Sequence, residues 1–153
     1  LHYKTIETME SRIRNRAEQA KPIDFAGLYR DDNSPVGLTD GDAMLELDDK
    51  VFAMFEFKKA GAGLTVGQRL LGERIVRRWG EGAYFAKVEH TTEQNESYIS
   101  GYEAKVTEVY TKVDSGEFKW VKIGGLSMRA FLVYITEKAE KEQNLPKKYV
   151  FQS

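Results

Sequence analysis

The sequence predicts a mixed α/β domain with helices packed on a sheet, and three observations predict this class. Apolar residues recur at helical spacing over residues 3–20. Two apolar runs then flank the polar tripeptide Asp48-Asp49-Lys50, which is typical of a β-hairpin. A second helical pattern begins after Thr65. We expect a single domain over residues 1–153, because no repeat, low-complexity run or linker divides the chain.

The composition excludes several kinds of site. The sequence has no cysteine, so disulfides, thiolate nucleophiles and cysteine-ligated zinc are excluded. His2 and His90 are the only histidines, which argues against a histidine-based nuclease, and His90 is interpreted as a strand-end residue. The net charge is −1, so any contact with nucleic acid depends on local patches. We expect a cytoplasmic protein with no membrane partner, since no apolar run approaches the ~20 residues of a membrane span and the N-terminus lacks a signal-peptide pattern.

The first predicted helix covers residues 3–20 and ends before Pro22. Its apolar stripe consists of Ile6, Met9, Ile13, Ala17 and Ala20. Glu10 lies about 40° from the centre of this stripe, so a carboxylate faces the buried side. Glu10 either has a role there or forms an edge-of-stripe pair with Arg14 at i+4. Residues 23–30 then predict a strand that a turn-rich loop follows.

The hairpin that follows has a register that the sequence predicts. Folding it about Asp49 gives one unbroken apolar face, formed by Ala43, Leu45, Leu47, Val51, Ala53, Phe55 and Phe57. The same register puts Asp42 opposite Glu56, with Cβ atoms roughly 5 Å apart. Opposed carboxylates in a half-buried sheet are unfavourable unless something compensates them, and a hard divalent cation would do so. Lys58 lies two residues beyond Glu56 on the same face.

The second predicted helix has Thr65 as its N-cap, runs through Trp79 and ends at Gly80. Its inward stripe consists of Leu71, Gly72, Ile75, Val76 and Trp79. Gln68 falls in the middle of this stripe. It either faces the carboxylates or satisfies free backbone groups in the first helical turn.

The outward side of this helix carries a basic cluster. Its members are Arg69, Arg74, Arg77 and Arg78, with Lys58 and Lys59 just upstream. Such a cluster is usually a solvated face. Beside a phosphodiester site it could contact two or three phosphates.

The rest of the chain predicts a strand over 83–89, a loop over 90–97, and a second hairpin of strands 102–113 and 118–123. We expect Gly124-Gly125 to break the second hairpin. Ser127 is then the predicted cap of a helix whose apolar residues are Met128, Phe131, Leu132, Ile135 and Ala139. A strand over 133–135 is the competing interpretation. The tail after 144–146 is expected to be irregular.

The Asp-x13-Glu-x-Lys spacing of Asp42, Glu56 and Lys58 on a hairpin resembles the active site of the PD-(D/E)xK nuclease superfamily. Gly41 stands where that name has a proline. The resemblance covers roughly residues 3–90 and implies a restriction-endonuclease-like α-β-β-β-α-β core. A hairpin and helix at about 98–144 are then an addition to that core.

The resemblance also implies a role for each residue of the site. Asp42, Glu56 and the backbone carbonyl of Phe57 would hold Mg²⁺ or Mn²⁺, and Lys58 would position or deprotonate the attacking water. Glu10 would be the metal-adjacent acid of the first helix. Gln68 occupies the place of a glutamine that faces the active site in virus-type replication-repair nucleases. Asp40, opposite Lys58 in the predicted register, would be an auxiliary ligand or a charge partner for that lysine.

The function that this resemblance implies is divalent-metal-dependent hydrolysis of DNA phosphodiester bonds, of a phage, repair or recombination type. DNA is the expected partner, and a homodimer is expected by analogy with short nucleases that cut two strands. One alternative is a catalytically silent module on the same fold that binds nucleic acid or protein. Another is an α+β interaction domain in which Glu56 and Lys58 form an ordinary cross-strand pair.

Overall fold

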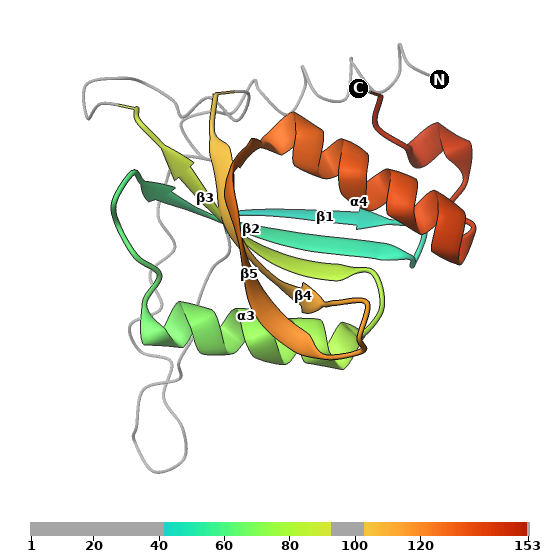
Figure 1. Cartoon of the computed structure of the whole chain (residues 1–153), viewed down its shortest axis with the longest axis horizontal. Helices are drawn as coiled ribbons and strands as arrows, with labels where there is room; N and C mark the ends of the chain where they lie inside the picture. The colour runs from blue at the N-terminus through green and yellow to red at the C-terminus, as the bar shows by residue number, and fades with distance from the viewer. Residues whose placement is uncertain (1–41, 93–102, 153) are drawn as a thin grey trace, which may run out of the picture. The chain divides into compact units, whose positions relative to one another are not determined.

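The computed structural model describes residues 42–92 and 103–152. These two ranges contain a five-stranded mixed sheet in the order β1-β2-β3-β4-β5 and two α-helices, an open-sheet α+β fold (Figure 1). The elements are β1 (Ala43–Leu47), β2 (Val51–Lys59), α3 (Val66–Trp79), β3 (Ala83–His90), β4 (Lys105–Lys112), β5 (Phe118–Ser127), α4 (Met128–Gln143) and the 3-10 helix η1 (Lys147–Tyr149). Within these ranges no helix is both long and apolar enough to cross a membrane.

The element order from the first hairpin onward is the order that the sequence predicts. His90 is the last residue of β3, which agrees with its interpretation as a strand-end residue. The predicted helix over 3–20, with Glu10, and the predicted strand over 23–30 lie outside the described residues. Asp40 also lies outside them.

The first hairpin has the predicted register. Ala43 pairs with Phe55, Leu45 with Ala53, and Leu47 with Val51. The turn is tight because Asp48 and Asp49 both adopt positive φ, at 51° and 58°, and the Lys50 N–H donates to the Leu47 carbonyl at 2.9 Å. Aspartate tolerates this conformation better than most residues do, so the polar tripeptide fixes the register.

Helix α3 connects the parallel strands β2 and β3 and covers one face of the sheet (Figure 1). It begins and ends as predicted, with Thr65 as N-cap and Gly80 as C-cap at φ 90°. The core on this face consists of Met54, Val76, Ala83, Phe85 and Tyr110. Gly72 lets the helix approach the sheet closely, because a Cβ at this position would clash with the ring of Phe85.

Helix α4 covers the other face of the sheet (Figure 1). Phe131 is buried there, with its ring edge-on to Phe55 and Tyr84 at centroid distances of 6.1 and 5.8 Å. The side chain of Ser127 caps the helix by accepting a hydrogen bond from the Ala130 N–H at 3.1 Å. The competing interpretation of a strand over 133–135 is therefore wrong, since a capped helix with its apolar stripe on the sheet includes these residues.

Two further expectations need correction. Gly124-Gly125 does not end the second hairpin, because β5 continues through the glycines to Ser127. Val106 pairs with Leu126 but Glu108 pairs with Lys122, so β5 has extra residues that form a bulge. The two glycines supply the positive φ values of 65° and 87° that this bulge contains. The tail is also not wholly irregular, because it contains η1.

Candidate active site

The structure brings Asp42 beside the Glu-x-Lys segment of β2. Residue 42 comes one position before the first paired residue, Ala43, so Asp42 lies just outside the ladder. Its Oδ2 accepts a hydrogen bond from the backbone N–H of Phe57 at 2.7 Å. This bond anchors the carboxylate next to Glu56, although the two residues are not a ladder pair.

Glu56 is a buried carboxylate with only 6% of its surface exposed. Gln68, in the first turn of α3, donates from Nε2 to Glu56 Oε1 at 2.7 Å. The other end of the same amide, Oε1, accepts from the Thr65 N–H at 3.0 Å and completes a capping box. Both interpretations of Gln68 therefore hold, because an amide has a donor end and an acceptor end.

Lys58 is half-buried on the same face of β2, two residues beyond Glu56. Its register neighbour on β3 is Glu89, whose carboxylate accepts instead from Lys87 Nζ at 2.9 Å. No ion pair or hydrogen bond joins Lys58 to any residue that the structure describes. Within the described residues, the Lys58 ammonium group is therefore a cation on the same face as Glu56 that has no ion pair or hydrogen bond.

Glu56 also belongs to a row of charged residues that crosses four strands. Glu56 pairs with Lys87, Lys87 with Glu108, and Glu108 with Lys122, so the charges alternate across the sheet. Lys87 is only 8% exposed, which makes two members of the row buried charges. Buried charges are costly unless they are paired. If these side chains served only to pack the sheet, apolar residues of similar size could replace them without loss of stability.

A hollow of about 670 Å³ lies beside this row, at the ends of β3 and β4 and near the bulge of β5. Its charged lining residues are Lys87, Glu89, Glu103, Lys105, Glu108 and Lys122. Thr107, the extra residue where β4 shifts register against β3, also lines it. The Thr107 hydroxyl is buried and has no hydrogen-bond partner among the described residues. The hollow thus presents lysines to a polar ligand, whereas the Thr107 hydroxyl is closed off from solvent in its wall.

The predicted basic cluster divides into two parts. Arg69 does not point outward as predicted, since it pairs with Glu108 at 2.9 Å and stacks over the ring of Trp120 at 4.6 Å. Arg77 donates to the Tyr110 hydroxyl at 3.1 Å. Residue 69 lies on the flank of α3 that overhangs β4 and β5, which explains the inward direction of its side chain.

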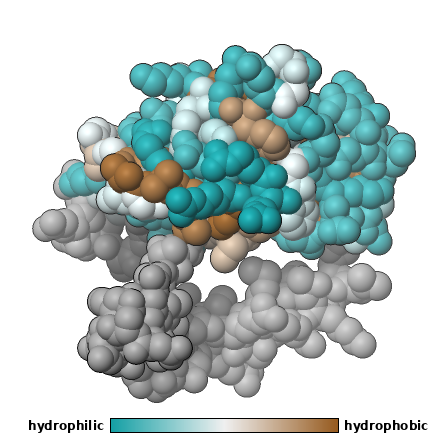
Figure 2. All heavy atoms as spheres, turned by 90° about the horizontal axis from the view of Figure 1, so that it is seen from below, coloured by the Kyte–Doolittle hydropathy of each residue, from teal (hydrophilic) through white to brown (hydrophobic). Residues whose placement is uncertain are grey.

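Arg74 and Arg78 form the outward part of the cluster. Both are exposed, and neither has a hydrogen-bond or ion-pair partner in the described ranges. With Arg77 they line a hollow of about 460 Å³ on the outer side of α3. The space-filling view toward this helix shows a mainly hydrophilic surface with small hydrophobic patches (Figure 2). Lys59, the last residue of β2, is also exposed.

The donors present suit a cation that retains water. No group of three or more histidine, cysteine, aspartate or glutamate side chains in the described part of the chain could hold a metal ion. Asp42 and Glu56 provide two hard oxygen donors. Mg²⁺ is usually held by one or two carboxylates together with waters and substrate phosphates, so two carboxylates fit it without a complete protein cage. Glu10 and Asp40, the other predicted acids, lie outside the described residues.

Sequence reasoning missed the charged row on β3, β4 and β5. The alternation of Lys87 and Glu89 with apolar neighbours was a signal that charged side chains share one face of a strand. Their alignment with Glu56 depends on strand pairing that no local pattern predicts, because a bulge shifts the register next to Lys87. Comparison of the chain with models of protein families, with curated proteins and with solved structures gave no match.

Proposed function

We propose that this chain is a divalent-metal-dependent nuclease of the PD-(D/E)xK type that hydrolyses DNA phosphodiester bonds. The observation that carries the proposal is the bond from the Phe57 N–H to Asp42, which places the aspartate beside Glu56 and Lys58 from 15 residues away. An interaction domain has no need to place two carboxylates and an unpaired lysine on one strand end. A metal-dependent phosphodiesterase can use this combination, with the carboxylates holding the cation and the lysine beside the attacking water.

Each residue has a distinct task in this proposal. Asp42 and Glu56, with the Phe57 carbonyl as the resemblance implies, would hold Mg²⁺ or Mn²⁺. When bound, the ion supplies positive charge where negative charge develops on the phosphoryl oxygens. Lys58 orients the attacking water and stabilises the negative charge that it acquires. Gln68 fixes the direction of the Glu56 carboxylate, because the helix cap holds the acceptor end of the amide and the donor end binds Glu56.

The exposed arginines give this nuclease a surface for the DNA backbone. Arg74 and Arg78 present guanidinium groups that the described protein does not use, and phosphate contacts supply most of the sequence-independent affinity. Lys105 and Lys122, at the hollow beside the charged row, are further cations for a strand that crosses the sheet.

The experiment is cleavage of plasmid, linear, single-stranded and four-way-junction DNA in Mg²⁺, in Mn²⁺ and in chelator. Wild type should cleave at least one substrate only with a divalent cation. Lys58→Ala should abolish cleavage while Mn²⁺ affinity by isothermal titration stays close to wild type, because an ammonium group is not a metal ligand. Lys119→Ala, at an exposed lysine of β5, is the matched control and should cleave normally.

The second candidate function is binding without catalysis on the same fold. The bond between Asp42 and the Phe57 amide favours it, since this carboxylate already satisfies a strand-edge donor without any metal. Binding of DNA or of Mn²⁺ with no cleavage in the panel above would support this candidate. Normal cleavage by Lys58→Ala would contradict the site assignment itself.

A further inference from the structure

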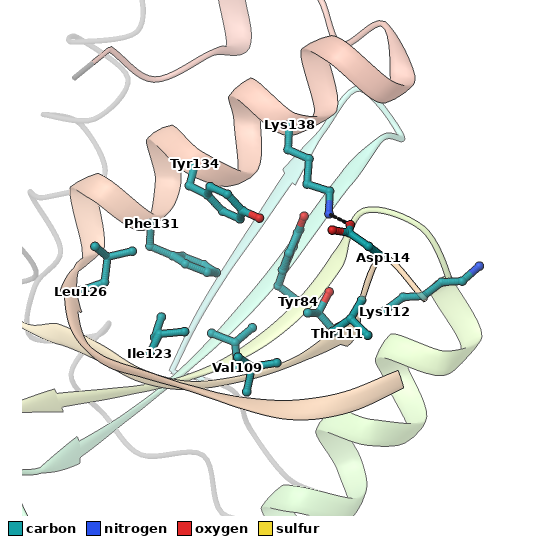
Figure 3. A pocket seen from close by; sticks show the side chains of 12 residues that line it. Tyr84, Val109, Thr111, Lys112, Asp114, Ile123, Leu126, Phe131, Tyr134 and Lys138 are labelled. Atoms are coloured by element: carbon teal, nitrogen blue, oxygen red, sulfur yellow. Dashed lines mark hydrogen bonds and ion pairs between the residues drawn. The ribbon is translucent and has the colours of Figure 1, made fainter. Parts of the chain in front are cut away.

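The structure contains a cavity on the sheet face opposite to Glu56 and Lys58. It lies between α4 and strands β3 to β5 and has a volume of about 350 Å³ (Figure 3). Tyr84 and Val109 line it and belong to the core under α4, whereas their neighbours Phe85 and Tyr110 face α3. Its walls are mainly apolar, formed by Val109, Val121, Ile123, Leu126 and Phe131. This volume is at the lower end of the range of about 300–1,000 Å³ for small-molecule sites.

Tyr84 places its hydroxyl in this cavity. The residue is only 7% exposed, and its hydroxyl points along the cavity toward Lys138 and Asp114 (Figure 3). No residue in the described ranges forms a hydrogen bond with it. Burial raises the pKa of Tyr84, and Tyr134, Glu142 and Glu81 raise it further, so the group remains an O–H donor. The hydroxyl opens into the cavity, so a ligand oxygen can accept its hydrogen bond in place of water.

The charges around the opening do not favour an anionic ligand. Lys138 pairs with Asp114 at 3.4 Å, and Lys112 pairs with Glu81 at 3.0 Å. Each lysine that lines the cavity therefore already forms an ion pair with a carboxylate. Glu142 adds a further negative charge near Tyr84. The negative charges that add to the effect of burial in raising the pKa of Tyr84 would also oppose a carboxylate beside it.

We propose that this cavity binds an uncharged, mainly apolar small molecule of about two fused rings, whose single acceptor oxygen takes the hydrogen bond of Tyr84. The edge-on rings of Tyr84 and Phe131 and the aliphatic walls suit an aromatic body. The buried Tyr84 donor on this apolar surface suits one acceptor, whereas the Tyr134 hydroxyl at the opening belongs to a side chain that is 56% exposed. The site is independent of the nuclease proposal, because no residue that lines it belongs to the candidate active site.

Three naphthalenes of similar shape test the proposal by NMR titration of the ¹⁵N-labelled full chain. 2-Acetylnaphthalene carries a neutral acceptor, 2-ethylnaphthalene carries none, and 2-naphthoate carries an anion. Saturable shifts are expected at the amides of Val109, Phe131 and Tyr134. The ketone should bind roughly three- to tenfold more tightly than the hydrocarbon, which is the effect of one net hydrogen bond. Naphthoate should bind most weakly of the three.

Two tyrosine variants then test whether Tyr84 donates the hydrogen bond to the ligand oxygen. Tyr84→Phe keeps the ring and should reduce ketone affinity to that of the hydrocarbon. Tyr110→Phe, which removes a hydroxyl on the α3 face of the same sheet, should leave all three affinities within twofold. Leu126→Trp, at a partly exposed wall residue, should weaken all three ligands by filling the cavity. The proposal is overturned if no probe gives saturable shifts at the cavity, if naphthoate binds as tightly as the ketone, or if Tyr84→Phe binds the ketone as wild type does.

Discussion

Replacing Gln68 by glutamate isolates the contact between helix α3 and the candidate active site. A glutamate at this position still has an oxygen for the Thr65 N–H, so the capping box survives. The donor that contacts Glu56 at 2.7 Å is lost, and a second carboxylate takes its place. The variant therefore changes one end of the side chain and keeps the other.

The cost of this change follows from the structure. A hydrogen bond to a charged group contributes about 1.5–3 kcal/mol. Two unit charges 4 Å apart at an effective dielectric constant of 20 repel by about 4 kcal/mol, which is an upper limit because residue 68 is only half-buried and can turn toward water. We expect Gln68→Glu to lose roughly 2–4 kcal/mol of unfolding free energy. At about 2–4 °C per kcal/mol, Tm should fall by roughly 4–16 °C in chelator.

Urea unfolding followed by circular dichroism, at neutral pH and in chelator, measures this loss. The double variant Glu56→Gln/Gln68→Glu reverses the polarity of the contact and should recover most of the lost stability, since an amide at 56 can donate to a carboxylate at 68. Thr65→Ala removes the hydroxyl that accepts from the Gln68 N–H but keeps the backbone N–H that binds the Gln68 amide, and it should cost about 0.5–2 kcal/mol. The reasoning is refuted if Gln68→Glu is as stable as wild type or if the double variant recovers nothing.

Three further predictions follow from other contacts. Gly72→Ala should destabilise the protein by about 1–3 kcal/mol through overpacking. Gly67→Ala in the same helix, where a Cβ would meet only Thr65 Oγ1 at 3.9 Å, should gain up to about 1 kcal/mol in urea unfolding. Asp42→Asn keeps an acceptor for the β2 amide but loses a ligand charge, so its Tm in chelator should equal or exceed that of wild type while Mn²⁺ raises it less. Arg74→Ala should reduce the slope of log DNA affinity against log salt concentration by about one, without loss of stability. Arg69→Ala should also lower Tm, because its ion pair with Glu108 is lost.

The features that the sequence predicted well are those that local residues determine. The hairpin register follows from two aspartates that tolerate positive φ, together with an apolar face that a one-residue slip would expose. The limits of α3 follow from Thr65, which accepts the first free N–H groups, and from Gly80, which adopts a conformation that other residues avoid. Each of these depends on contacts within a few residues along the chain.

The features that it did not predict depend on long-range pairing. Two consecutive glycines usually end a strand. Here β5 pairs with β4 on both sides of Gly124 and Gly125, so the glycines lie in a bulge within the strand. Arg69 has the position of a solvated residue, yet the sheet extends far enough to place Glu108 and Trp120 under it. Because these partners are far apart in the sequence, no helical or strand periodicity predicts their contacts.

The start of helix α3 connects the stability of the fold to the candidate site. The first turn of α3 has no acidic residue of its own, although the N-terminus of a helix favours negative charge. Glu56 from β2 supplies a carboxylate near this turn through its bond with Gln68. The same amide closes the capping box, so unwinding the first turn would release Glu56 as well as the backbone. A change that unwinds the first turn, and so frees the Gln68 amide from the Thr65 N–H, should therefore disorder the Glu56 carboxylate before it unfolds the sheet.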